Sequence, residues 1–223
     1  MLLNRLIDHT LLTPNAMDTA YEDLLQAAVT HDFYAVCVAP HVAEFAVAGL
    51  KDYPNTKVCS VVAFPHGNVP VRWKIDQASY LIDKGVHEID WVLNCGDVFD
   101  ERWETIRQEM MHMSNLCGAN KVVSKVIVES GTIVHKRLLT RLFQTVRDTG
   151  VNFIKTSTGF NGPGAAVRDV RLWNELRDGA EYPKIKASGG IKTPEQALAM
   201  VKAGADRLGM SSSVDVMEKW IQS

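Results

Sequence analysis

Short apolar runs rich in β-branched residues alternate with longer amphipathic runs along the whole chain. Runs of the first kind are typical of buried strands, and runs of the second kind are typical of helices that cover a sheet. We expect strands at residues 5–10, 34–38, 58–64, 88–94, 124–129, 153–158, 185–188 and 207–210. We expect helices between them, including residues 18–31, 40–53, 71–85, 101–116, 136–150 and 193–204.

The last of these helices carries end signals. Thr193 is suited to the N-cap, Pro194 to the first helical position, and Gly204 to the position just past the end. These signals predict that the helix begins at Pro194 and ends before Gly204.

The order of the elements predicts the fold. Strands that alternate with helices over 223 residues, without a linker, form a parallel sheet. We predict an α/β fold, a single (β/α)₈ TIM barrel whose one domain occupies residues 1–223. A doubly wound open sheet is the alternative, but no G-x-G-x-x-G follows the first strand and no P-loop occurs.

Composition narrows the class of protein. Hydrophobic residues make up 46% and charged residues 22%, enough for a full core, and the net charge is -2 with no basic block. This argues against nucleic acid as the main partner. The N-terminal residues resemble neither a signal peptide nor a membrane span, and four widely spaced cysteines indicate reduced thiols in the cytoplasm.

Polar residues recur inside the predicted strands at positions that face one way. If Lys155 points into the barrel, Ile154 points to the helices; the same holds for Lys186 beside Ile185, and for Asp90 between two apolar neighbours. Asp8 and Lys125 add two further charges. Because burial of unpaired charges is costly, and ion pairing alone is a weak source of stability, we expect a functional centre here.

The positions of the lysines indicate that a lysine amine acts as a nucleophile at this centre. Lys155 and Lys186 lie on successive strands, which are neighbours in a barrel. Two ammonium groups held close together disfavour each other's charge, so a lysine there can be neutral and attack a carbonyl to form a Schiff base. Asp90 would manage the protons. No metal-ligand spacing is visible, and we expect neither a metal nor another cofactor.

Two Gly/Ser segments follow the last two predicted strands, "SGGIKT" at 188–193 and "GMSSSVD" at 209–215. Loops at these positions form the phosphate site of many barrel enzymes, although ordinary turn and capping chemistry explains either segment alone. Together they favour a phosphorylated substrate. A third segment, "GFNGPGA" at 159–165, is either a cover or an extra phosphate contact.

The motifs "LIDHTLL", "FPHGN", "EIDWVLN", "KVIVESG", "FIKTSTGF" and "KASGGIKT" together resemble the deoxyribose-phosphate aldolase family, from about residue 7 to residue 213. The resemblance implies a metal-independent class I aldolase whose partners are a small phosphorylated sugar and acetaldehyde, and it leaves a homodimer open. It implies that Lys155 forms the Schiff base, assisted by Lys186 and Asp90. The substrate-binding residues it implies are Asp8, Cys37, Lys125, Thr156, Gly159, Ser188, Gly189, Gly190, Lys192, Gly209, Ser211 and Ser212.

The sequence departs from the family in three places, one of which is the unusual pair Trp91 and Cys95 that flanks the strand of Asp90. Pro163 stands in a loop that is richer in Gly and Thr in many relatives, and the chain stops at Ser223 without the tyrosine-ended tail of some of them. We therefore expect no proton transfer through a tail.

Two other functions remain open at this point. One is a phosphosugar isomerase or decarboxylase on the same barrel, in which Lys155 is a general base only. The other is a sugar-phosphate sensor without catalysis.

Overall fold

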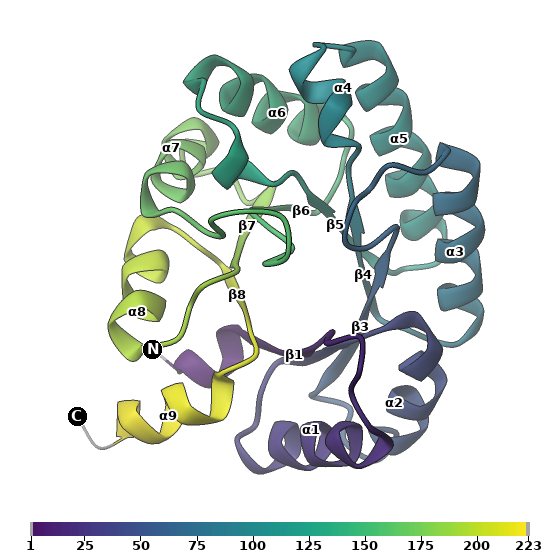
Figure 1. Cartoon of the computed structure of the whole chain (residues 1–223), viewed down its shortest axis with the longest axis vertical. Helices are drawn as coiled ribbons and strands as arrows, with labels where there is room; N and C mark the ends of the chain where they lie inside the picture. Colours follow the sequence, from purple (N-terminus) through teal and green to yellow (C-terminus); the bar gives the residue numbers. More distant parts are fainter. Residues whose placement is uncertain (1, 222–223) are drawn as a thin grey trace.

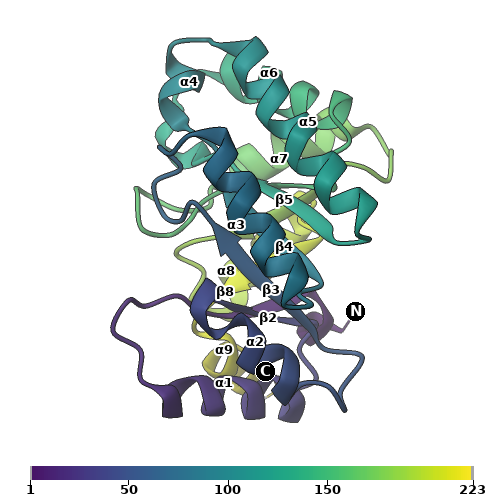
Figure 2. The same cartoon turned by 90° about the vertical axis from the view of Figure 1, so that its right-hand side faces the viewer.

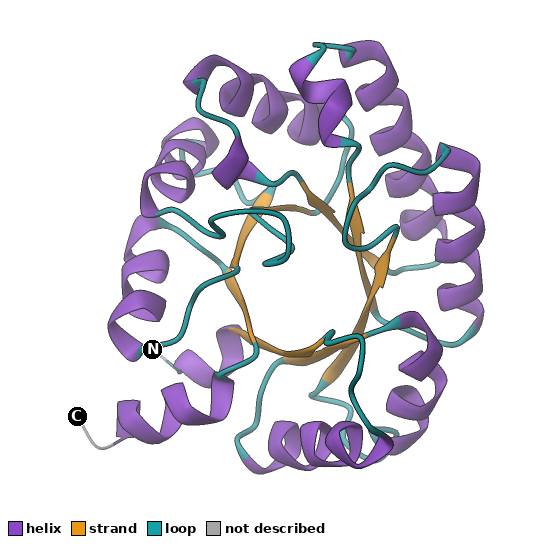
Figure 3. Cartoon of the chain, in the orientation of Figure 1, coloured by secondary structure: helices purple, strands orange, loops and turns teal. Residues whose placement is uncertain are grey.

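The computed structural model describes residues 2–221, and within them eight parallel strands close into a barrel in the order β1 to β8. The helices form a ring around the barrel (Figures 1 and 3). The predicted TIM barrel is confirmed, and the open sheet is excluded because β1 pairs with β8.

All eight predicted strands are present, with ends that differ by a few residues. The strands are β1 (Ile7–Leu11), β2 (Ala35–Val38), β3 (Lys57–Val62), β4 (Glu88–Val92), β5 (Val123–Ile127), β6 (Phe153–Lys155), β7 (Lys184–Ser188) and β8 (Arg207–Met210). The largest error is in β6, which ends at Lys155 instead of residue 158. Just beyond it, the Thr156 hydroxyl donates to the carbonyl of Ser188 and accepts from the N–H of the same residue.

The described helices are α1 (Asp18–Thr30), α2 (Ala43–Gly49), α3 (Val71–Asp83), α4 (Cys95–Phe99), α5 (Trp103–Ala119), α6 (Lys136–Asp148), α7 (Val167–Arg177), α8 (Pro194–Ala203) and α9 (Ser213–Ile221). The predicted signals of α8 are confirmed, and Gln196 completes a capping box with Thr193. Among residues 2–221, no helix has the length and apolar character needed to cross a membrane.

Side chains alternate between the two faces of the barrel wall as predicted. Ile89, Trp91, Ile154 and Ile185 point outward and pack in the apolar layer between strands and helices. This layer is continuous under the helices; α3 and α5, for example, lie side by side over one part of the barrel (Figure 2). The apolar layer therefore determines which strand residues face the barrel interior.

The register places the inward residues next to one another. Lys155 pairs with Lys186 across β6 and β7, and Asp90 pairs with Lys125 across β4 and β5. A small interior cluster of Cys37, Cys59 and Val61 lies on β2 and β3 and is separate from the outer apolar layer.

Candidate active site

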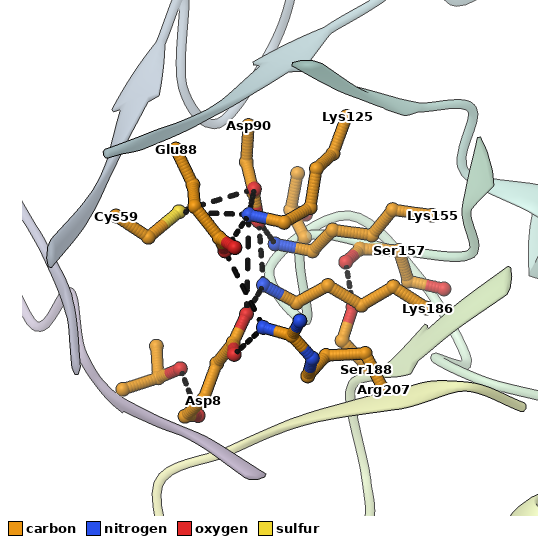
Figure 4. Close-up of polar contacts among 12 residues, drawn as sticks. Asp8, Cys59, Glu88, Asp90, Lys125, Lys155, Ser157, Lys186, Ser188 and Arg207 are labelled. Atoms are coloured by element: carbon orange, nitrogen blue, oxygen red, sulfur yellow. Dashed lines mark hydrogen bonds and ion pairs between the residues drawn. The ribbon is translucent and has the colours of Figure 1, made fainter. Parts of the chain in front are cut away.

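Seven charged side chains meet inside the barrel and form what we call the charged cluster (Figure 4). They come from six strands and are no more than 7% exposed: Asp8, Glu88, Asp90, Lys125, Lys155, Lys186 and Arg207. The predicted convergence of Asp8, Asp90 and the three lysines is thus present in the structure.

Asp90 is the centre of the cluster. Its Oδ1 accepts from Lys125 Nζ at 2.7 Å, and its Oδ2 accepts from Lys155 Nζ at 2.7 Å and from Lys186 Nζ at 2.8 Å. One carboxylate therefore contacts all three lysines, and Lys155 and Lys186 share a single oxygen atom. This arrangement lets a proton pass between the two amines through Asp90.

Two more carboxylates complete the network. Asp8 accepts from Lys186 through Oδ2 and from Arg207 through Oδ1 at 2.8 Å. Glu88 lies 2.6 Å from Lys125 Nζ and 3.4 Å from Arg207. Within the charged cluster every carboxylate contacts at least two cations.

Sequence reasoning missed Glu88, Arg207 and Cys59 as members of this interior. The signal was available for the first two: Glu88 lies two residues before Asp90, and Arg207 two residues before Gly209, so each shares its strand face with a predicted site residue. Cys59 could be placed only through its pairing with Cys37, which requires the register of β2 against β3.

The cluster keeps its carboxyl groups ionised. Burial raises the pKa of Asp8, but attraction to Lys186, Arg207 and Lys125 outweighs burial, so the pKa lies below its ordinary value. For Asp90, burial again opposes ionisation, and Lys125, Lys155 and Lys186 hold the pKa well below its ordinary value. Asp90 is thus a carboxylate, able to accept a proton.

Two of the lysines are held as ammonium groups. Burial lowers the pKa of Lys186, but attraction to Asp8 and Asp90 is stronger and raises the pKa above its ordinary value. Burial also lowers the pKa of Lys125, and Asp90, Cys59, Glu88 and Asp8 together raise it well above the ordinary value. These lysines therefore carry charge and are poor nucleophiles.

A formal charge count singles out the remaining lysine. With all groups ionised, the cluster holds four cations and three carboxylates, an excess of one positive charge. Loss of one proton from Lys155, which contacts a single carboxylate, makes the cluster neutral. Among the four cations, Lys155 is therefore the one with the fewest carboxylate partners.

A cavity of about 280 Å³ opens above the cluster at the carboxyl ends of the strands. Among the three lysines of the cluster, Lys155 is the one that borders it. The other predicted residues that line it are Gly159, Ser188, Gly189, Gly190, Lys192, Gly209 and Ser211. Residues that line it but were not predicted as site residues are Thr10, Leu12, Thr13, Thr158, Phe160, Ile191 and Met210.

Seven other predicted site residues do not line this cavity. Asp8, Asp90, Lys125, Lys186 and Cys37 lie below it in the barrel interior, fully buried. The Thr156 hydroxyl is hydrogen-bonded to the Ser188 backbone. Thr156 therefore supports the loop that follows β7 and does not contact substrate. Ser212 lies just before α9, where its carbonyl accepts from the N–H of Val216.

Gly209 leaves room beside Lys186 that a larger residue would fill. A Cβ at Gly209 would lie 2.9 Å from Ser188 Cβ and 3.2 Å from Lys186 Cε. A side chain at this position would clash with Ser188 and crowd the amine-bearing chain of Lys186.

The segment 159–165 reaches over the opening of the barrel (Figure 1) and is held there by two kinds of contact. Asn161 donates to the Pro65 carbonyl at 2.6 Å, and Phe160 packs edge-on against Phe64. At its other end, Gly164 approaches Gly189 so closely that a Cβ would lie 2.5 Å from the Gly189 carbonyl oxygen. The segment therefore forms part of the cavity wall.

The fold also gathers one set of potential metal ligands that the sequence spacing did not reveal. Cys37, Cys59 and Asp90 offer ligand atoms that all lie within 4.8 Å of one another.

Comparison with known proteins agrees with this geometry. The sequence profile of the DeoC/LacD family aldolases matches residues 3–217. Deoxyribose-phosphate aldolase 1 of Vibrio vulnificus is 36% identical over 216 residues, covering 96% of this chain and 95% of that protein. The deoxyribose-phosphate aldolase of Metamycoplasma arthritidis is 37% identical over 218 residues, covering 98% of both chains. A deoxyribose phosphate aldolase structure from Aeropyrum pernix, described as tetrameric, superposes with a TM-score of 0.88 at 30% identity, covering 98% of this chain and 90% of that one. The chain belongs to the DeoC/LacD family of aldolases.

Proposed function

We propose that this chain is a class I deoxyribose-phosphate aldolase. It reversibly cleaves 2-deoxy-D-ribose 5-phosphate to D-glyceraldehyde 3-phosphate and acetaldehyde. The observation that carries the proposal is the position of Lys155, which borders the cavity above and contacts Asp90 below.

The first stage forms the Schiff base. The neutral amine of Lys155 attacks C1 of the open-chain sugar, and loss of water from the carbinolamine gives an iminium ion. The surplus positive charge of the cluster favours the neutral amine at the start. Asp90 accepts and returns the protons that this stage moves, because its Oδ2 contacts Lys155 directly.

The second stage breaks the C2–C3 bond. The C3 hydroxyl loses its proton to Asp90, directly or through Lys186 or a water molecule, and its oxygen forms the new aldehyde. The electron pair of the C2–C3 bond moves to C2 and is delocalised onto the iminium nitrogen, which gives an enamine. Glyceraldehyde 3-phosphate leaves, C2 of the enamine takes up a proton, and water releases acetaldehyde from Lys155.

The phosphate binds at the far side of the cavity in this proposal. Gly189 and Gly190 both have positive φ, 88° and 79°, which turns the backbone tightly and opens it to close approach by an anion. Ser211 and Lys192 border the same part of the cavity. Ser212, just before α9, adds the positive end of that helix dipole.

Reductive trapping tests the assignment. Borohydride added with acetaldehyde should fix an ethyl group on one lysine, and peptide mapping should find it on Lys155. Lys155→Leu should abolish trapping and turnover, whereas Lys186→Leu, the matched control on the next strand, should still be trapped. An isomerase or decarboxylase that uses Lys155 as a base would show no adduct, and an ethyl group on Lys186 or Lys125 would reverse the roles.

Two expectations, on cellular location and on oligomeric state, belong to the same proposal. Four cysteines, all free in the described structure, suit a cytoplasmic enzyme. The homodimer that the sequence leaves open stays a prediction, to be checked by light scattering.

A further inference from the structure

Two cysteines face each other inside the barrel next to the catalytic aspartate. Cys37 on β2 and Cys59 on β3 are register partners, and both are fully buried. Cys59 Sγ donates to Asp90 Oδ1 at 3.1 Å, and the two sulfur atoms and the Asp90 oxygen all lie within 4.8 Å of one another. The proposed aldolase mechanism gives the thiol of Cys59 no role.

The two oxygen atoms of Asp90 serve different sides of the cluster. Oδ2 contacts Lys155 and Lys186, while Oδ1 contacts Cys59 and Lys125. A cation bound on the sulfur side would therefore use Oδ1 and displace the Lys125 ammonium, which donates both to Oδ1 and, at 3.3 Å, to Cys59 Sγ. Lys125 would keep Glu88, at 2.6 Å, as its partner.

The ligand chemistry suits a thiophilic cation. Two thiolates and one carboxylate are ligands of Zn²⁺ and similar d¹⁰ ions, with metal–sulfur bonds of about 2.3 Å in tetrahedral geometry. Such a metal spans two sulfur atoms about 3.8 Å apart.

The charge balance also permits a cation among the lysines. A divalent ion that replaces the two thiol protons leaves the formal charge of the barrel interior unchanged. The positive excess of the cluster is therefore no larger with the metal bound than without it.

We propose that Cys37, Cys59 and Asp90 form a binding site for a thiophilic divalent cation, Zn²⁺ or Cd²⁺, and that its occupation inhibits the enzyme. A metal on Oδ1 withdraws electron density from the Asp90 carboxylate, which then accepts protons poorly. The inhibition rests on the proposed aldolase function; the binding does not.

Binding is tested with Cd²⁺ on the purified full chain, under anaerobic conditions without added thiols. Thiolate-to-cadmium charge transfer should appear in the ultraviolet and saturate at one ion per chain. Loss of even an outer partner of a ligand weakens metal binding by about 10- to 100-fold, so Cys59→Ala should weaken it by at least about 100-fold. Cys117→Ala, a buried thiol in the outer layer, is the matched control and should bind as the wild type does.

Inhibition is measured with Zn²⁺, each variant being compared with its own metal-free rate. Wild type and Cys117→Ala should lose activity and regain it with EDTA, and Cys59→Ala should be resistant. If Cys59→Ala does not fold, Cys37→Ala serves as the second variant. The inference is overturned if wild type shows no charge-transfer band, or if a folded variant at either position binds Cd²⁺ unchanged. A band without any aldolase activity would instead leave the site standing and refute the proposed function.

Discussion

Replacement of Lys186 by methionine tests whether the charge balance of the cluster controls Lys155. The substitution removes one cation and keeps a side chain of similar length. Asp8 keeps Arg207 at 2.8 Å, and Asp90 keeps Lys125 and Lys155, each at 2.7 Å. No carboxylate loses its last partner, so the loss of stability should be well below the about 3–5 kcal/mol typical of an uncompensated buried charge.

The expected size of the activity change in Lys186→Met follows from the Asp90 oxygen atom that the two lysines share. Lys186 and Lys155 both contact Asp90 Oδ2, so their ammonium groups repel at short range. Two unit charges about 5 Å apart interact by about 3 kcal/mol at an effective dielectric constant of about 20, which corresponds to about 2 pH units. Without Lys186, three cations face three carboxylates and the cluster is neutral only while Lys155 stays protonated.

The assay is the pH dependence of deoxyribose 5-phosphate cleavage. For Lys186→Met, the acidic limb of the profile of kcat/KM should move about 2 pH units toward alkaline pH, with an activity loss at neutral pH of about 100-fold that shrinks as pH rises. Lys186→Arg retains the charge and should keep the wild-type midpoint. A loss of the same size at every pH would refute the electrostatic reasoning and assign Lys186 to direct proton transfer.

Three further predictions concern other parts of the molecule. Dialysis against EDTA should leave the aldolase rate unchanged, and a rate restored only by added Zn²⁺ would contradict a class I mechanism. Ser211→Asp should lower kcat/KM for deoxyribose 5-phosphate by about two orders of magnitude through repulsion of the phosphate, with a far smaller effect on unphosphorylated deoxyribose; equal losses would refute the phosphate position. Lys74→Met should cost about 3–5 kcal/mol of unfolding free energy in urea, because it leaves Glu109, 2.8 Å away, as a buried unpaired carboxylate. Lys74→Met combined with Glu109→Leu should recover most of that loss, and no recovery would mean that packing, not charge, sets the cost.

The fold was predictable because the outer apolar layer leaves a clear pattern in the sequence. Residues such as Ile154 and Ile185 mark the helix-facing side of each strand, and the helices follow at regular intervals. The strand ends were less predictable. β6 ends at Lys155, and just beyond it the Thr156 side chain bonds the Ser188 backbone, a contact that no periodicity in the sequence reveals.

The interior position of the candidate site residues was predictable, but the balance of charges among them was not. Alternation alone placed Lys155, Lys186 and Asp90 in the interior. It could not show that Asp90 lies between the lysines, so the sequence suggested ammonium groups that repel each other without a shared partner. The structure adds that carboxylate, and with it the reason why Lys186 and Lys125 remain charged.

The apolar residues that fold the barrel also determine which side chains face its cavity. Side chains on a strand alternate with a period of two, so a shift of β6 by one residue would turn Lys155 into the helix layer and Ile154 into the cavity. Burial of Ile154 among the helices opposes that shift, and so does the pairing of Lys155 with Lys186 across β7. Lys155 therefore needs no contact of its own that is strong enough to hold the strand in register. The apolar neighbours fix the register of the strand, so the charged cluster needs only to keep its buried charges paired.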